Sequence, residues 1–165
     1  MMSSTSEPTS PSSHLNSASE SYDVIYEQMK AGLVKRFPPA LIRLKPEFEH
    51  SAPNRIRIYL DRDRIKGTHY QITFRREYYE FALHFESSRE MSLKRRQAFD
   101  PHLDELTKQV GILVRSGPVE NRGWMRVWYE QNREPIGQDQ IKLYIDQYSR
   151  FIAATFPILA KLYGL

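Results

Sequence analysis

Histidine and glutamate side chains supply the first candidates for chemistry. The chain has five histidines, and none of them shows the short helical spacing of a metal site. His69 and His84 lie in segments that we expect to pair as adjacent strands, and Glu86 follows His84 by two positions. Two imidazoles and a carboxylate there could bind a divalent metal, but paired surface histidines usually occur without one. The sequence therefore predicts no metal site and no cofactor.

A metal-dependent nuclease is the enzyme that the acidic residues would fit best. Its site needs two carboxylates that hold Mg²⁺ and a nearby lysine that assists attack. The candidates by residue type are Asp61, Asp63, Glu80 and Glu86, but the segment from Glu80 to Glu86 reads EFALHFE and has no lysine. The chain also has no cysteine, no Gly-rich phosphate loop and no nucleophile elbow. We therefore rank an enzyme behind a non-catalytic binding module.

Arginine and aromatic residues alternate with apolar residues along four short segments. If Ile56, Tyr70 and Phe81 face the core, the arginines and rings between them share the opposite side of the sheet. Guanidinium groups bind phosphate and rings stack on bases in single-stranded nucleic-acid platforms, although the same pairs can also simply stabilise a solvated sheet. The candidate binding residues on this side are Arg55, Arg57, Tyr59, Arg75, Trp124, Arg126 and Trp128, and those in the first hairpin turn are Arg62, Arg64 and Lys66.

Positive charge is concentrated in the same part of the chain. The full sequence has 24 basic and 20 acidic residues, a net charge of +4. Two of the acids lie before residue 22, which leaves a net charge of +6 for the rest. Between Arg55 and Arg96, eleven basic residues stand against six acidic ones. A local excess of this kind favours an anionic partner such as nucleic acid.

Hydrophobic periodicity indicates which elements position these residues. Alternating apolar residues predict five strands, at residues 55–61, 68–75, 79–86, 112–115 and 124–130. Apolar residues three and four apart predict helices at residues 21–37, 88–110 and 138–163, with a break at Pro101 and a bend at Pro157. Residues 40–54 are expected to be an irregular connection. The order α-β-β-β-α-β-β-α predicts an α+β domain in which helices cover one face of an antiparallel sheet of about five strands.

Composition divides the chain into two parts. Residues 1–21 contain nine serines and no aromatic residue, so we expect a disordered tail. Residues 22–165 are expected to form a single domain, since the 40% hydrophobic content of the chain supports one sizeable core. No apolar run approaches the ~18 residues of a membrane span, and the N-terminus lacks the layout of a secretory signal. Because cysteine is absent as well, the expected location is the cytoplasm, away from membranes.

Part of the chain resembles an uncharacterised α+β module. The resemblance extends from Tyr79 through Phe156 and is carried by the segments EFALHFES, LTKQVG, GWMRVWYE and FIAATFP. That module is found as the C-terminal part of bacterial and archaeal proteins whose other half resembles restriction endonucleases. The resemblance covers about half the chain, and it implies an accessory, non-catalytic domain in a nucleic-acid context. It assigns no catalytic residue.

The order of elements is also similar to that of bacterial type III secretion chaperones. These are small dimers that hold extended protein segments, so a chaperone-like, protein-binding homodimer is the alternative to a nucleic-acid partner, although the similarity itself concerns architecture and leaves the partner open. They are typically acidic, whereas this domain is basic, and fold alone does not fix function. The sequence thus predicts a binding module whose partner is nucleic acid or protein, with a metal-dependent nuclease as a further alternative.

Overall fold

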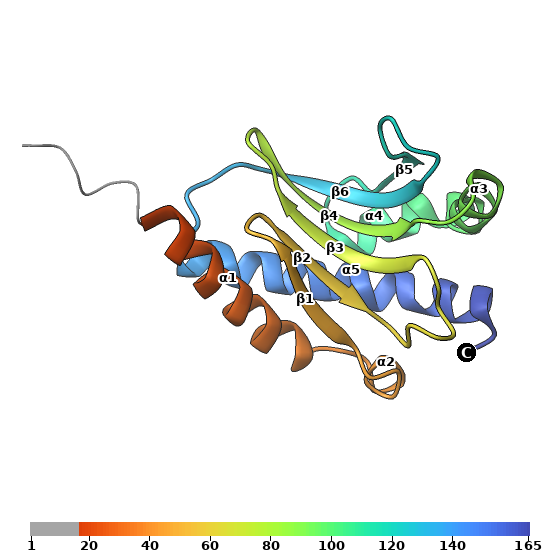
Figure 1. Cartoon of the computed structure of the whole chain (residues 1–165), viewed down its shortest axis with the longest axis horizontal. Helices are drawn as coiled ribbons and strands as arrows, with labels where there is room; N and C mark the ends of the chain where they lie inside the picture. The colour runs from red at the N-terminus through yellow and green to blue at the C-terminus, as the bar shows by residue number, and fades with distance from the viewer. Residues whose placement is uncertain (1–16) are drawn as a thin grey trace, which may run out of the picture.

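One six-stranded antiparallel sheet forms the centre of the molecule, in the order β1-β2-β3-β4-β6-β5 (Figure 1). The structure is a computed structural model that describes residues 17–165. The strands are β1 (Glu47–Ala52), β2 (Arg55–Tyr59), β3 (Thr68–Phe74), β4 (Tyr78–Phe85), β5 (Arg115–Pro118) and β6 (Met125–Asn132). The predicted α+β class, with helices packed on an antiparallel sheet, is confirmed.

Strands β2, β3 and β4 form the predicted meander of consecutive hairpins. Ile58 lies opposite Tyr70, and Tyr70 lies opposite Leu83. These three side chains are buried in the core, because alternate residues of a strand point to the same side of the sheet. The turn between β3 and β4 is closed by a hydrogen bond of 3.0 Å from the Arg75 amide to the Tyr78 carbonyl.

Helices cover the apolar face of the sheet. They are α1 (Ser17–Val34), α2 (Pro39–Ile42), α3 (Arg89–Gln97), α4 (Leu103–Val110) and α5 (Gln138–Tyr163), with the 3-10 turn η1 (Asp100–His102). The longest helix, α5, runs behind the strands in Figure 1, and both α1 and α4 pack against it. Tyr148 on α5 donates a hydrogen bond of 2.9 Å to the carbonyl of Ala82 on β4. None of the helices within residues 17–165 has the length and apolar composition that a membrane span requires.

The helix boundaries agree with the sequence patterns in the middle of the chain and differ at its start. Helix α1 begins at Ser17, whereas the sequence pattern predicts a start at Ser21. Residues 1–16 of the predicted tail lie outside the described residues. The predicted break at Pro101 is confirmed, because η1 separates α3 from α4. Helix α5 continues as one helix through Pro157, where the missing amide proton removes one helical hydrogen bond.

The sequence predictions at two strands are wrong. Residues 40–54 contain β1 and most of α2, where the sequence predicts an irregular connection. Strand β1 is an edge strand with one large apolar residue, Phe48, so it lacks the alternation that identifies a half-buried strand. Strand β5 begins at Arg115 rather than at residue 112, and the Val114 amide before it donates to the Thr107 hydroxyl at 3.0 Å.

Candidate functional site

The sheet face opposite the helices is polar, and its side chains lie in register across the strands. One row contains Tyr59, His69, His84 and Arg126, the next contains Arg57, Gln71, Ala82 and Trp128, and the third contains Arg55, Thr73, Glu80 and Glu130. Although this face points away from the helices, His69, Glu80 and His84 are buried. The face is therefore a packed polar layer rather than a freely solvated surface.

A pocket of about 230 Å³ lies on this face, and we call it the sheet-face pocket. Strands β2 to β4 supply half of its lining, Arg75 and Glu86 directly follow β3 and β4, and the loop between β5 and β6 adds the remaining residues. The lining includes four arginines and one glutamate and consists of Arg55, Arg57, Gln71, Thr73, Arg75, His84, Glu86, Val119, Arg122 and Trp124.

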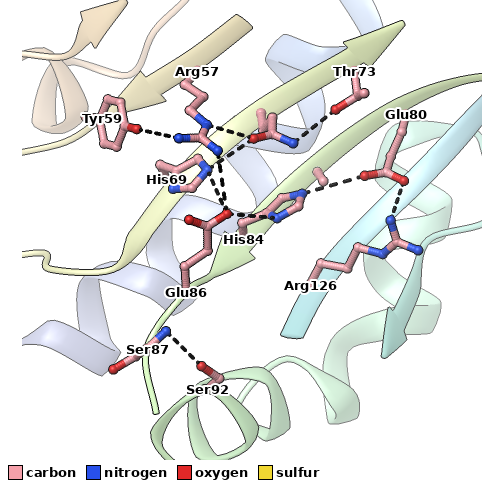
Figure 2. A network of polar contacts seen from close by, with 12 residues as sticks. Arg57, Tyr59, His69, Thr73, Glu80, His84, Glu86, Ser87, Ser92 and Arg126 are labelled. Carbon is pink, nitrogen blue, oxygen red and sulfur yellow. Dashed lines mark hydrogen bonds and ion pairs between the residues drawn. The ribbon is translucent and has the colours of Figure 1, made fainter. Parts of the chain in front are cut away.

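Glu80 on β4 is fully buried next to this pocket and is paired with arginine. Its carboxylate contacts the guanidinium of Arg126 on β6 (Figure 2) and lies 3.4 Å from that of Arg75. Burial alone would raise the pKa of Glu80, but the His84 ring and the two arginines outweigh burial and hold the pKa below its usual value. The carboxylate is therefore ionised at neutral pH, and it offsets part of the positive charge of the face.

Two histidines and a second glutamate meet beside this pair. His69 on β3 lies directly opposite His84 on β4, with ring centroids 5.5 Å apart. The Glu86 carboxylate lies 3.7 Å from His69 Nε2 and 3.7 Å from His84 Nδ1 (Figure 2). On the other side of its ring, His84 Nε2 is 3.6 Å from Glu80 Oε1. Burial, followed by electrostatic interactions with His84 and Arg57, lowers the pKa of His69 to about 3, so this ring is neutral at pH 7.

Arg57 is held in place by three side chains of the same face. Its Nε donates to Gln71 Oε1 at 3.0 Å, and its Nη1 donates to the Tyr59 hydroxyl at 3.2 Å. Its Nη2 lies 3.9 Å from the Glu86 carboxylate. Gln71 is oriented in turn, because its Nε2 donates to the Thr73 hydroxyl at 3.0 Å. The fold itself thus fixes the position of the Arg57 guanidinium at the pocket.

The position of Glu86 depends on the loop between β2 and β3. The Glu86 amide donates to the Gly67 carbonyl at 2.6 Å. Gly67 adopts a φ of +66°, and a Cβ at this residue would collide with the carbonyl oxygen of Glu86. On the other side, the Ser87 amide donates to Ser92 Oγ at 3.1 Å (Figure 2). The end of β4 is therefore fixed from two directions.

Several of the sequence-predicted binding residues meet at the sheet-face pocket. Arg126 and Trp128 lie beside it on β6, where the Arg126 guanidinium is 4.3 Å from the centroid of the Trp128 ring. The predicted residues that line the pocket itself are Arg55, Arg57, Arg75 and Trp124. The structure therefore gathers on one face the arginines and rings that alternate in the sequence.

The residues predicted in the first hairpin turn do not line this pocket. The Arg62 guanidinium lies 3.7 Å from the centroid of the Tyr59 ring and pairs with two glutamates of β1 at 3.0 and 3.2 Å. Arg64 and Lys66 are exposed. Arg95 on α3 donates to the Lys66 carbonyl at 3.1 Å. The turn and α3 thus form a second basic region, away from the pocket lining.

Two residues of the pocket were not identified from the sequence. Val119 and Arg122 lie in the loop between β5 and β6, where no alternation indicates which way a side chain points. The structure places the Arg122 guanidinium 4.6 Å from the centroid of the Trp124 ring. An arginine close to an aromatic residue in a short loop was the only available hint.

No family model, curated protein or solved structure matches this chain. The two resemblances based on sequence patterns therefore stay predictions. The function has to be argued from the geometry and charge of the site.

Proposed function

We propose that this protein binds single-stranded nucleic acid on the polar face of its sheet. The observation that carries the proposal is the lining of the sheet-face pocket, where four arginines and Trp124 surround a single glutamate. Arginine guanidinium groups bind phosphate oxygens, and an indole ring stacks on bases of any sequence. The pocket therefore offers both kinds of contact that a single strand needs.

The arginines of the pocket are available to different degrees. Arg57 is already fixed by its neighbours, and Arg75 shares the carboxylate of Glu80. Arg55 Nε is buried and has no hydrogen-bond partner among the described residues. Arg122 is exposed and lies over the Trp124 ring. A bound phosphate group would therefore supply a new interaction partner mainly to Arg55 and Arg122.

The shape of the pocket favours a single strand over a duplex. A space of about 230 Å³ accepts one unstacked base with part of its backbone, whereas a duplex presents its bases stacked and paired. Trp124 is half-buried at the edge of the pocket. An unstacked base can reach that ring, but a paired base cannot.

The nuclease alternative has weaker support from the same residues. Glu80 is neutralised by Arg126 and Arg75, so it is not free to hold Mg²⁺. Asp61 accepts a hydrogen bond of 3.3 Å from the Arg64 amide within its own turn. The residues that line the pocket include no lysine. These contacts favour binding without cleavage.

The proposal is tested by the salt dependence of binding to short oligo-dT and oligo-U, measured by fluorescence anisotropy with the full chain. Each neutralised phosphate of a single strand contributes a slope of about −0.7 to log affinity against log salt. The variant Arg55→Ala/Arg122→Ala is therefore expected to bind more weakly and to reduce the slope by about 1.4.

A matched control variant also removes two positive charges, but outside the pocket. Lys35 and Arg43 are exposed on the helical side, near the ends of α1 and α2. The variant Lys35→Ala/Arg43→Ala is expected to bind like the wild type. The proposal is wrong if the wild type has no affinity at low salt, or if both double variants lose affinity and slope equally.

A further inference from the structure

Three side chains with metal-binding atoms converge at one end of the polar face. His69 Nε2 and His84 Nδ1 each lie 3.7 Å from one oxygen of Glu86. All three ligand atoms lie within 4.8 Å of one another. Their elements are neighbouring strands whose register places the two histidines directly opposite each other. Figure 2 shows both rings directed at the Glu86 carboxylate.

The second observation is the unsatisfied state of His84. Both of its ring nitrogens are buried and lack a hydrogen-bond partner among the described residues, and so does Glu80 Oε1. Buried polar atoms without partners are rare and call for an explanation. A cation bound at Nδ1 would supply the missing partner on one side of the ring. It would also fix the proton on Nε2, which then points at Glu80 Oε1, 3.6 Å away.

This arrangement matches the known pattern around metal-bound histidine. A ligating imidazole usually donates its other N–H to a carboxylate, which fixes the ring and makes it a stronger ligand. Glu80 is in position to do this for His84, since it is fully buried and held by Arg126. Glu80 is therefore a positioning residue, whereas the atoms on the metal come from His69, His84 and Glu86.

The two distances to Glu86 require only a small contraction, and the two histidine nitrogens, which lie within 4.8 Å of each other, must also approach. Metal bonds of about 2.0–2.1 Å place neighbouring ligand atoms of a tetrahedral site roughly 3.3 Å apart, compared with 3.7 Å for both pairs that include Glu86. His69 Nε2 would release its 3.4 Å contact with Gln71 Oε1. Arg57 would release its 3.9 Å contact with Glu86 and keep its bonds to Gln71 and Tyr59. Because His84 and Glu86 also line the sheet-face pocket, a fourth coordination position opens into it.

We infer that His69, His84 and Glu86 form a binding site for a divalent transition-metal ion. Two imidazoles and one carboxylate with an open position are a donor set that Zn²⁺ and Fe²⁺ accept. The inference is independent of the proposed function, because the ion binds in the absence of nucleic acid. Zn²⁺ is the probe, since it has no redox chemistry to complicate the measurement.

The first test is calorimetric titration of Zn²⁺ into the full, tag-free chain after treatment with a chelator. We expect one ion per chain, and a loss of affinity of at least about 100-fold in Glu86→Gln and in His69→Gln. The controls are His102→Gln and Glu130→Gln, which remove a histidine and a glutamate outside the cluster and should bind like the wild type. Circular dichroism shows whether each variant is folded.

The second test begins with the wild type alone, so that its first result does not depend on a variant that folds. X-ray absorption at the zinc edge of the 1:1 complex should show two imidazole ligands and oxygen in the remaining positions. With Co²⁺ in place of Zn²⁺, Glu80→Gln should shift the visible absorption bands, a change that a loss of stability alone does not cause. The inference is overturned if the wild type binds no ion, if the spectrum shows fewer than two imidazoles, or if Glu86→Gln and His69→Gln bind like the wild type.

Discussion

The carboxylate of Glu80 is buried against the guanidinium of Arg126 on the polar face of the sheet. The two residues lie on neighbouring strands, β4 and β6. The Arg126 guanidinium in turn lies over the ring of Trp128. This buried charge pair therefore stabilises the sheet. It also helps to position the residues that we propose bind ligands.

Replacing Glu80 with glutamine should therefore destabilise the protein strongly. Removing one partner of a buried ion pair leaves an uncompensated buried charge and typically costs about 3–5 kcal/mol. The control is Glu130→Gln, because Glu130 pairs with the exposed Arg115 and such pairs are worth about 0–1 kcal/mol. The measurement is urea unfolding at pH 7. Equal losses of unfolding free energy in Glu80→Gln and Glu130→Gln would show that the buried pair stabilises the protein no more than the exposed pair.

The neutral state of buried His69 predicts an acid-sensitive fold in the presence of a chelator. Burial lowers the pKa of His69 to about 3, whereas a histidine in the unfolded chain has a pKa of about 6.5. Between these values the unfolded chain binds one more proton, so stability falls as the pH is lowered through this window, by up to about 1.4 kcal/mol per pH unit.

The variant His69→Gln removes this titration. Its free energy of unfolding should depend less on pH between about 6.5 and 5 than that of the wild type, because glutamine has no proton to gain. The exposed His102 provides the control, and His102→Gln should keep the pH dependence of the wild type. If the free energy of unfolding changed equally with pH in the wild type and in His69→Gln, the claim that His69 is buried in its neutral form would be wrong.

Gly67 should tolerate no side chain. A non-glycine residue at its φ of +66° costs about 1–2 kcal/mol, and the collision of a Cβ with the Glu86 carbonyl adds roughly 1–3 kcal/mol. Gly111 is a matched control, because its φ is +81° but a Cβ there meets nothing within 4 Å. Gly67→Ala should therefore unfold at lower urea than Gly111→Ala, and it should also weaken Zn²⁺ binding by displacing Glu86. Equal urea midpoints for the two variants would contradict this prediction, because the β2–β3 loop would then shift to accept the Cβ without a loss of stability.

Sequence patterns predicted the central part of the fold because its strands alternate strictly. Ile56, Ile58 and the residues of β3 and β4 mark one face as apolar, and this fixed which arginines and rings share the other face. The same reasoning predicted that His69 could meet His84. It failed at β1, where Phe48 alone is large and apolar, and at β5, where a glycine and a proline do not suggest a strand.

The depth of the polar face could not be predicted in the same way. Alternation assigns polar residues to the solvent side, yet Glu80, His84 and Arg126 are buried. They are buried because the polar side chains of this face pack against one another, as Glu80 does against Arg126, and the β5–β6 loop adds Arg122 and Trp124 to the same face. Neither these contacts between strands nor the position of Arg122 is encoded in a local pattern.

The two tryptophans offer the most direct test of the central claim. They are the only tryptophans of the chain, Trp124 and Trp128, and both belong to the polar face. Intrinsic tryptophan fluorescence therefore reports on this face alone. Titration of a short single-stranded oligonucleotide at low salt should quench the emission in a saturable way, since a base stacks on Trp124, and Trp124→Phe should lose most of the quenching. Oligonucleotide binding that is seen by anisotropy but leaves tryptophan emission unchanged would contradict the account.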